Sequence, residues 1–213
     1  MTGTYIDIAG LARLLEDKAR AGARVVVALA GAPGSGKSTL AQQLCAELNA
    51  RDAGTAAVLA MDGFHYDDMY LIPAGLRPRK GAPETFDVAG LYHVLKRLRA
   101  RDEAFVAVPV FDRDIEVARA GASMISALVP VIIVEGNYLL MEQEPWSRLR
   151  EMFDVTVLTD VPEPVLRERL IARWRHYRLP PEEISSKLES NDLPTRRLVV
   201  AQSRGEDFRL LNG

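Results

Sequence analysis

Short apolar runs alternate along the chain with longer stretches in which apolar residues recur every three or four positions. Each run is six to eight residues long and ends in glycine or in polar and acidic residues. A continuous apolar run of this length is typical of a strand buried on both faces of a parallel sheet. The pattern predicts strands over residues 25–30, 56–61, 129–136 and 153–160.

The longer stretches have the periodicity of amphipathic helices. The first follows Asp7, a candidate N-cap, and is expected to stop at Gly22. Leucines four residues apart mark a second helix over residues 37–52, and a third is expected over residues 88–100. Strands that alternate with helices favour an α/β domain of three layers, with a mostly parallel sheet between two layers of helices.

The pattern is less regular toward the C-terminal end. A helix is predicted from Pro181, and Asn191 with Asp192 predict a turn after it. The apolar run at residues 198–202 is interpreted as a strand, and residues 208–213 as an edge strand.

Composition and charge exclude several classes of protein. The chain has 213 residues, of which 48% are hydrophobic and 26% charged, so we expect one globular domain over residues 1–213. Its 27 Lys and Arg against 29 Asp and Glu give a net charge of −2, so neither nucleic acid nor a membrane surface is an expected partner. A single cysteine, Cys45, cannot form an intramolecular disulfide, and no apolar run approaches the ~20 residues that span a bilayer. We therefore expect a cytoplasmic protein.

A glycine-rich segment joins the first predicted strand to the second predicted helix. It reads GAPGSGKST, which satisfies the nucleotide-binding pattern G-x-x-x-x-G-K-[ST]. Its glycines allow a tight turn whose N–H groups converge on an anion, and the N-terminus of the helix adds its positive end. Lys37 is expected to reach the β- and γ-phosphates of ATP, and Ser38 to ligate Mg²⁺. The expected nucleotide-binding residues are Gly31, Ala32, Pro33, Gly34, Ser35, Gly36, Lys37, Ser38 and Thr39.

Two acidic residues follow predicted strands, at the sheet edge where ligands bind in open α/β folds. Asp62 is a candidate to orient a hydroxyl group and take its proton, and a helix cap is the alternative. Glu135 is a candidate to hold Mg²⁺ or to accept a hydrogen bond from substrate, and a structural carboxylate at a strand end is the alternative. His65, close to Asp62 in sequence, is expected to hydrogen-bond substrate or backbone.

Six segments in a fixed order resemble a known family: GAPGSGKST, MDGFH, RKGAPETFD, PVFDR, VEGNYLL and RERLIARWR. Together they cover most of the chain and are similar to the phosphoribulokinase, uridine kinase and bacterial pantothenate kinase family of P-loop kinases, with most similarity to its fructose transport system kinases. The resemblance implies a P-loop kinase fold with a five-stranded parallel core and a helical lid. It implies ATP as donor, a small-molecule hydroxyl as acceptor, Asp62 as catalytic base, and Glu135 as the acid of the family's EG motif.

The motifs leave the acceptor open. Uridine and pantothenate kinases tend to have Tyr where this chain has Phe111, and the His that commonly follows it is missing. Asp112, Arg113 and Glu116 instead offer charged groups suited to a polyol or sugar acid, so we predict a small sugar such as fructose. Pantothenate and the nucleosides uridine and cytidine are the alternative acceptors. For the three charged residues, the alternative is a hairpin whose polar side chains only face solvent.

Five arginines lie within residues 167–178, and two of them, Arg169 and Arg173, are one helical turn apart. The resemblance implies that these two belong to a lid and stabilise charge on the transferred phosphoryl group. A solvated helix face is the alternative for each.

A P-loop NTPase regulator is the rival function, although it would need no base, acceptor pocket or lid. A homodimer stays open as the oligomeric state.

Overall fold

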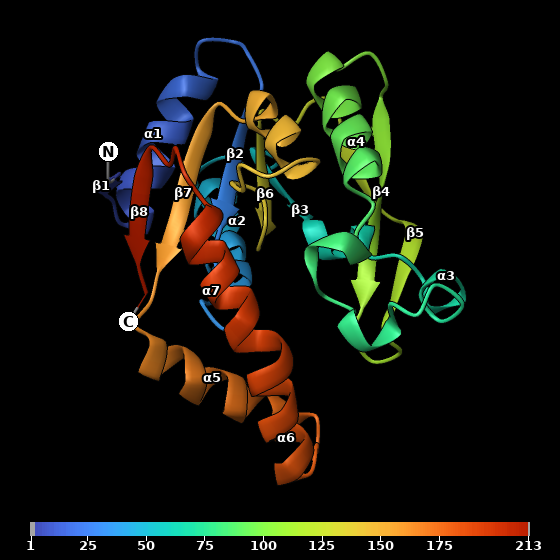
Figure 1. Cartoon of the computed structure of the whole chain (residues 1–213). Helices are drawn as coiled ribbons and strands as arrows, with labels where there is room; N and C mark the ends of the chain where they lie inside the picture. Colours follow the sequence, from blue (N-terminus) through green and yellow to red (C-terminus); the bar gives the residue numbers. More distant parts are fainter. Residues whose placement is uncertain (1–2, 213) are drawn as a thin grey trace.

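The computed structural model describes residues 3–212, which form a six-stranded sheet with helices on both faces and a separate hairpin (Figure 1). The strands of the large sheet lie in the order β1-β8-β7-β2-β6-β3, and every neighbouring pair is parallel. The adjacent strands β2 and β6 are buried along their whole length, as their apolar runs predict. The strands are β1 (Thr4–Tyr5), β2 (Val25–Ala30), β3 (Ala56–Ala60), β6 (Val131–Gly136), β7 (Val155–Asp160) and β8 (Phe208–Leu211).

Two layers of helices cover the sheet, because successive side chains of each buried strand point to opposite faces. One face packs against α1 (Ile8–Ala19) and α2 (Lys37–Arg51). The other packs against α4 (Val88–Ala100), the 3₁₀ segment η4 (Trp146–Met152) and α7 (Leu193–Gln202). Each layer has its own apolar core, so the predicted three-layer α/β fold is confirmed.

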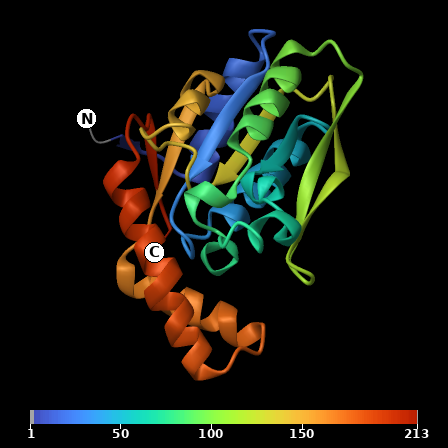
Figure 2. The ribbon, with the colours of Figure 1, turned by 45° about the vertical axis from the view of Figure 1, so that its right-hand side comes forward.

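A two-stranded antiparallel hairpin stands beside the large sheet. It consists of β4 (Phe105–Asp112) and β5 (Val117–Ser126), and Val106, Val108 and Ile125 join it to the core. Figure 2 shows the hairpin at the edge of the molecule, and its turn lies at the same end as the carboxyl ends of the parallel strands. This position brings the turn close to the P-loop end of the sheet.

Two helices project beyond the carboxyl ends of the strands (Figure 1). They are α5 (Glu163–His176) and α6 (Pro181–Lys187), and they pack on each other through Leu170 and Ile184. The π-helical segment η5 (Leu188–Asp192) joins α6 to α7. This projecting pair is the expected helical lid.

Three details differ from the sequence predictions. The sheet has six strands rather than five, because β1 is two residues long and leaves no mark in the hydrophobic pattern. No turn forms at residues 191–192, and the predicted strand at 198–202 is helical, since both segments belong to the continuous run η5–α7. Residues at positions 195, 198, 199 and 202 are buried or half-buried, which is helical rather than alternating spacing. The predicted C-terminal strand exists as β8, but β1 lies outside it, so it is not an edge.

The predicted N-cap at Asp7 is confirmed, and a second aspartate caps α4. The Asp7 side chain accepts a hydrogen bond from the Gly10 N–H at 2.7 Å, and Asp87 caps α4 in the same way at Gly90. Helix α1 ends at Ala19, and Gly22 follows in the turn to β2 with φ +89°. No helix within residues 3–212 combines the length and apolar character that crossing a membrane requires.

Candidate functional site

The segment Gly31–Thr39 comprises the turn between β2 and α2, at the carboxyl end of the sheet, and the first three residues of α2. Gly36 immediately precedes α2 with φ +77°, a left-handed conformation that side chains rarely adopt. A Cβ at Gly31 would lie 1.7 Å from Oγ1 of Thr159, so only glycine fits there. Oγ1 of Thr159 also lies 2.9 Å from Oγ of Ser35, and Asn212 Nδ2 donates to the Ser35 carbonyl at 2.7 Å. The loop is therefore held by the ends of β7 and β8 as well as by its own strand.

Lys37, Ser38 and Glu135 meet at the start of α2. The Ser38 hydroxyl donates to Oε2 of Glu135 at 3.1 Å, and Glu135 is only 5% exposed at the end of β6. Burial raises the pKa of Glu135, against the opposing effect of Lys37. Burial also lowers the pKa of Lys37, although the nearby Glu135 and Asp62 carboxylates favour its charged form. Glu135 is therefore a buried carboxylate coupled to the half-buried Lys37 and hydrogen-bonded to the exposed Ser38.

Asp62 lies in the 3₁₀ segment η1 (Met61–Phe64), directly after β3. Its Oδ2 accepts a hydrogen bond from Nη2 of Arg113, which reaches across from the hairpin turn. Burial alone would raise the pKa of Asp62, but Arg113, followed by His65 and Lys37, outweighs it and holds the pKa below its ordinary value. Asp62 therefore forms an ion pair rather than the helix cap considered from the sequence.

Aromatic and cationic side chains form the wall opposite the P-loop. The Phe111 ring has the Lys80 ammonium 5.7 Å and the Arg113 guanidinium 5.6 Å from its centroid. His65 stacks at 4.7 Å from Phe111, and its Nδ1 lies 2.8 Å from the Asp62 carbonyl oxygen. Glu116 also borders this region, but its side chain is exposed, and its backbone carbonyl accepts a hydrogen bond from Lys80.

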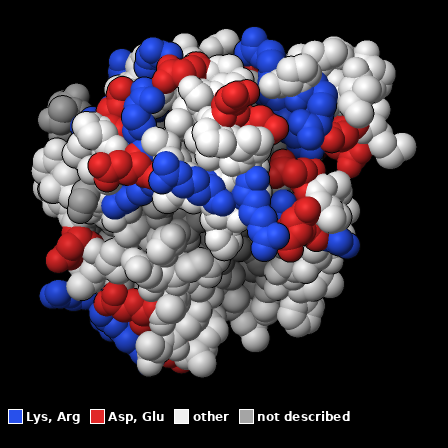
Figure 3. All heavy atoms as spheres, turned by 90° about the horizontal axis from the view of Figure 1, so that it is seen from below, with Lys and Arg blue, Asp and Glu red and all other residues white. Residues whose placement is uncertain are grey.

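The lid contributes Arg169 and Arg173 to the same cleft, whose volume is about 510 Å³. Arg169 donates to the Asn212 carbonyl at 2.8 Å, while burial lowers the pKa of Arg173. Arg167, by contrast, pairs with Glu189 away from the cleft. Figure 3 views the molecule from the lid side, where Lys and Arg are interspersed with Asp and Glu.

The structure thus brings most of the predicted site residues together in one cleft. Among its lining residues are Lys37, Ser38, Asp62, His65, Arg113, Glu116, Arg169 and Arg173, and Glu135 is bonded to Ser38 beneath it. Asp112 is directed elsewhere, because its carboxylate accepts from Arg119 at 2.8 Å.

Sequence reasoning missed several residues that shape this cleft. Thr159 and Asn212 support the P-loop, and each stands at the end of a strand, which is the signal that could have found them. Asn137 lines the cleft two residues after Glu135, and its Oδ1 has no hydrogen-bond partner within residues 3–212. Asp192, which the sequence marked as a turn residue, lies in η5 and lines the cleft, and the sequence did not predict that its carboxylate accepts a hydrogen bond from Trp174 Nε1 of α5 at 2.8 Å.

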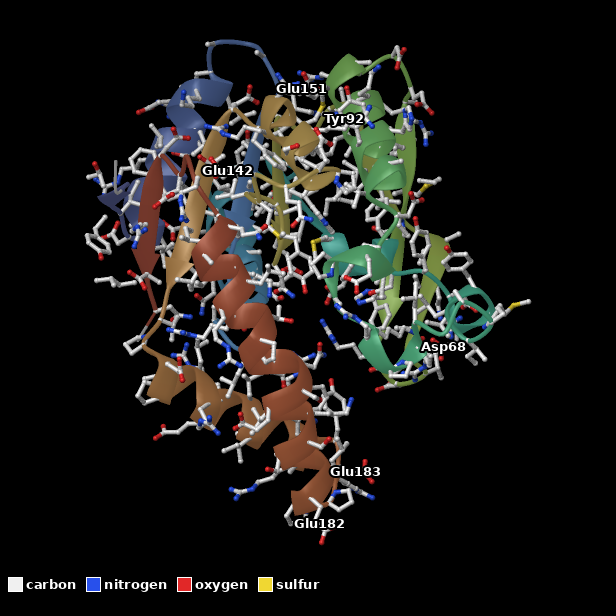
Figure 4. All side chains as sticks on the ribbon, in the orientation of Figure 1. Asp68, Tyr92, Glu142, Glu151, Glu182 and Glu183 are labelled. Atoms are coloured by element: carbon white, nitrogen blue, oxygen red, sulfur yellow. The ribbon has the colours of Figure 1, made fainter. Side chains whose placement is uncertain are left out.

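A second cavity of about 730 Å³ lies between α7 and the ends of β7 and β8. Of the predicted site residues, only Ala32 and Ser35 border it. Its mouth includes Glu142, labelled near the upper end of α7 in Figure 4.

Several known proteins are similar to the chain over most of its length. The crystal structure of a "putative fructose transport system kinase" from Silicibacter sp. TM1040 is 40% identical, with a TM-score of 0.84, and the match covers 93% of this chain and 98% of that one. The "Uncharacterized protein YggC" of Escherichia coli K12 is 41% identical over 152 residues, 70% of this chain and 62% of YggC. The "Putative uridine kinase C227.14" of Schizosaccharomyces pombe is 33% identical over 155 residues, 70% of this chain and 66% of that protein. The chain therefore spans just under two thirds of these two curated relatives.

Two further matches help to identify the family. The family description "Methylmalonyl Co-A mutase-associated GTPase MeaB" matches residues 9–65 only, the segment from α1 through the P-loop to η1. Pantothenate kinases match more of the chain, and that of Myxococcus xanthus is 30% identical over 156 residues, although the chain spans 49% of its length. Since the Silicibacter protein is 40% identical and covered along nearly its whole length, this chain belongs to the family of P-loop kinases related to uridine and pantothenate kinases.

Proposed function

We propose that the protein transfers the γ-phosphoryl group of ATP to a hydroxyl group of a small molecule. The observation that carries this proposal is the position of the Asp62 carboxylate, which lines the same cleft as Lys37 and Ser38 of the P-loop. A regulator that only bound nucleotide would need neither a carboxylate beside the phosphates nor an aromatic and cationic wall opposite them.

The residues at the P-loop suit Mg·ATP. Ser38 and Glu135 offer the oxygen ligands that Mg²⁺ prefers, and they are already hydrogen-bonded to each other. Within residues 3–212 no group of three or more His, Cys, Asp and Glu is arranged to hold a metal ion, so Mg²⁺ would depend on phosphate oxygens as well. When bound, Mg²⁺ neutralises charge on the phosphates. Lys37 would hold the β- and γ-phosphates beside it.

The chain's own residues account for the transfer step. The acceptor oxygen forms a bond to the γ-phosphorus, the bond to the bridging oxygen breaks, and its electron pair leaves with ADP. Asp62 takes the proton of the acceptor hydroxyl. Arg169 and Arg173 stabilise the charge that spreads over the phosphoryl oxygens, which is the larger part of the work in a loose transition state.

For the acceptor we propose a small sugar or polyol such as fructose. His65, Arg113 and Glu116 supply polar groups along the wall, and Asn137 adds a carbonyl oxygen that has no partner within the described part of the chain. The name of the Silicibacter relative agrees with this choice. The names of other relatives favour uridine or pantothenate, so these two and cytidine are the competing acceptors.

A screen of acceptors tests the proposal. Release of ADP is measured with fructose, other sugars, sugar acids, uridine, cytidine and pantothenate at one concentration of magnesium and ATP. A pocket that hydrogen-bonds several hydroxyls rejects analogues that lack them, so one class should lead clearly in kcat/KM. A higher kcat/KM for uridine or pantothenate than for every sugar would contradict the proposed sugar acceptor, but it would still support a kinase. Phosphate release that no acceptor changes favours the NTPase regulator.

A further inference from the structure

Arg113 forms an ion pair with the proposed base inside the cleft. Its Nη2 donates to Oδ2 of Asp62, 51 residues earlier in the chain. The Arg113 side chain is 37% exposed and that of Asp62 is 21% exposed, so the cation is the more exposed partner and the carboxylate is partly shielded from water.

The backbone beneath Arg113 is fixed at both ends of the hairpin turn. Lys80 Nζ donates to the Glu116 carbonyl at 2.6 Å and to Oδ1 of Asp68 at 2.7 Å, and Figure 4 labels Asp68 on α3. At the other end Asp112 accepts from the Asp114 N–H at 3.2 Å and from Arg119 at 2.8 Å. Because both ends of the turn are held, rotation of the Arg113 side chain is the smallest movement that would separate it from Asp62.

The Arg113 guanidinium contacts an aromatic ring of the same wall while it is bonded to Asp62. It already lies 5.6 Å from the centroid of the Phe111 ring, within the range of a cation–π contact. Hydroxyl or anionic groups of an acceptor bound against this wall would also compete for its N–H groups.

We propose that Arg113 restrains Asp62 while the acceptor site is empty, so that the carboxylate does not activate water against ATP. The inference rests on the proposed function. A charge-assisted hydrogen bond occupies one carboxylate oxygen and makes the group a weaker proton acceptor. Arg113 is thus a positioning residue that acts through Asp62.

The reaction that Arg113 would suppress is the hydrolysis of ATP. The oxygen of water forms a bond to the γ-phosphorus, and the bond from phosphorus to the bridging oxygen breaks with its electron pair on ADP. One proton of water passes to Asp62 and then to solvent, leaving ADP and inorganic phosphate. Water and an acceptor hydroxyl would both give their proton to Asp62. Since water is always present, loss of the Arg113 contact should increase hydrolysis when no acceptor is bound.

The test measures phosphate release from Mg·ATP with no acceptor present. Arg113→Ala should raise the rate by roughly tenfold or more, within the ~10²–10⁴-fold that a general base contributes. The double variant Arg113→Ala/Asp62→Asn should lose that increase. Arg113→Lys keeps a positive charge but loses the guanidinium group, so its rate should lie between those of the wild type and Arg113→Ala. The matched control is Arg97→Ala, which also loses an ion pair, to Glu103, but neither lines the cleft nor holds the hairpin turn, and it should leave the rate unchanged.

Two results would overturn the inference. One is an unchanged or lower rate in Arg113→Ala, provided that its circular dichroism spectrum and its Mg·ATP affinity by calorimetry match the wild type. The other is an increase that persists in the double variant, because it would not act through Asp62. Failure of the proposed function looks different, since the wild-type protein would then phosphorylate none of the acceptors in the screen, whatever the Arg113 variants do to phosphate release.

Discussion

The two walls of the cleft are built in different ways. The P-loop wall is backbone, fixed between two buried elements and tied by Thr159 and Asn212 to the neighbouring strands. The opposite wall consists of long side chains on a hairpin and short helical turns, joined by ion pairs such as Arg113–Asp62 and Lys80–Asp68. The phosphate-binding side is therefore set by the fold, whereas the acceptor side can change its specificity without disturbing the sheet.

Asp62→Asn should have the largest effect on the rate, and it should distinguish the role of the acceptor wall from that of the P-loop wall. It keeps the shape of the side chain but removes the proton acceptor, so kcat with the best acceptor should fall by ~10²–10⁴-fold. Mg·ATP affinity should change little, because the phosphates are held by the other wall. Near-normal kcat in this variant would leave Asp62 with a structural role only.

Lys37→Ala should act on the P-loop wall. Loss of the ammonium group removes a point charge from the β- and γ-phosphates, and the rate should fall by roughly 10²–10³-fold. Calorimetry should detect weaker Mg·ATP binding, while the thermal unfolding transition stays cooperative. If binding and rate both survived, the phosphates would have to lie elsewhere.

These two variants concern residues that the sequence could identify, and the reason is local. The P-loop is one contiguous segment whose glycines, lysine and flanking elements are readable together, and Asp62 and Glu135 directly follow apolar runs. The ion pair between Arg113 and Asp62 could not be predicted, because it joins two turns whose relative position depends on how the hairpin packs beside the sheet. The helix at 193–202 was misread for a related reason, since Leu198, Val199 and Val200 resemble a strand until the packing face is known.

Thr159→Val should give a smaller effect on the P-loop wall alone. It keeps the volume but removes the hydroxyl that lies 2.9 Å from Ser35 Oγ and 3.0 Å from the Ala30 carbonyl. A hydrogen bond of this kind contributes about 0.5–1.5 kcal/mol, so Mg·ATP affinity should weaken by roughly 2–10-fold. The KM for the acceptor at saturating ATP should stay the same. A change in acceptor KM instead would mean that the two walls are coupled.

The smallest effect concerns His65 on the acceptor wall. Burial lowers its pKa below the ordinary 6.5, although Asp62 favours the charged form. Because the unfolded chain takes up the proton first, stability is lost as the pH falls through 6.5 toward the lower pKa of the folded state. NMR titration should place the His65 midpoint below 6.5, with His65→Gln identifying its signal. In that variant the loss of thermal stability over this interval should be smaller, and a midpoint above 6.5 would contradict the buried arrangement.

The most direct test of the account is a ³¹P NMR time course of Mg·ATP with the best acceptor from the screen. The account predicts that the γ-phosphate signal declines while a phosphomonoester signal and ADP grow in equal amounts, and that Asp62→Asn nearly abolishes this change. Growth of inorganic phosphate alone, at a rate that the acceptor does not alter, would contradict transfer to a hydroxyl group.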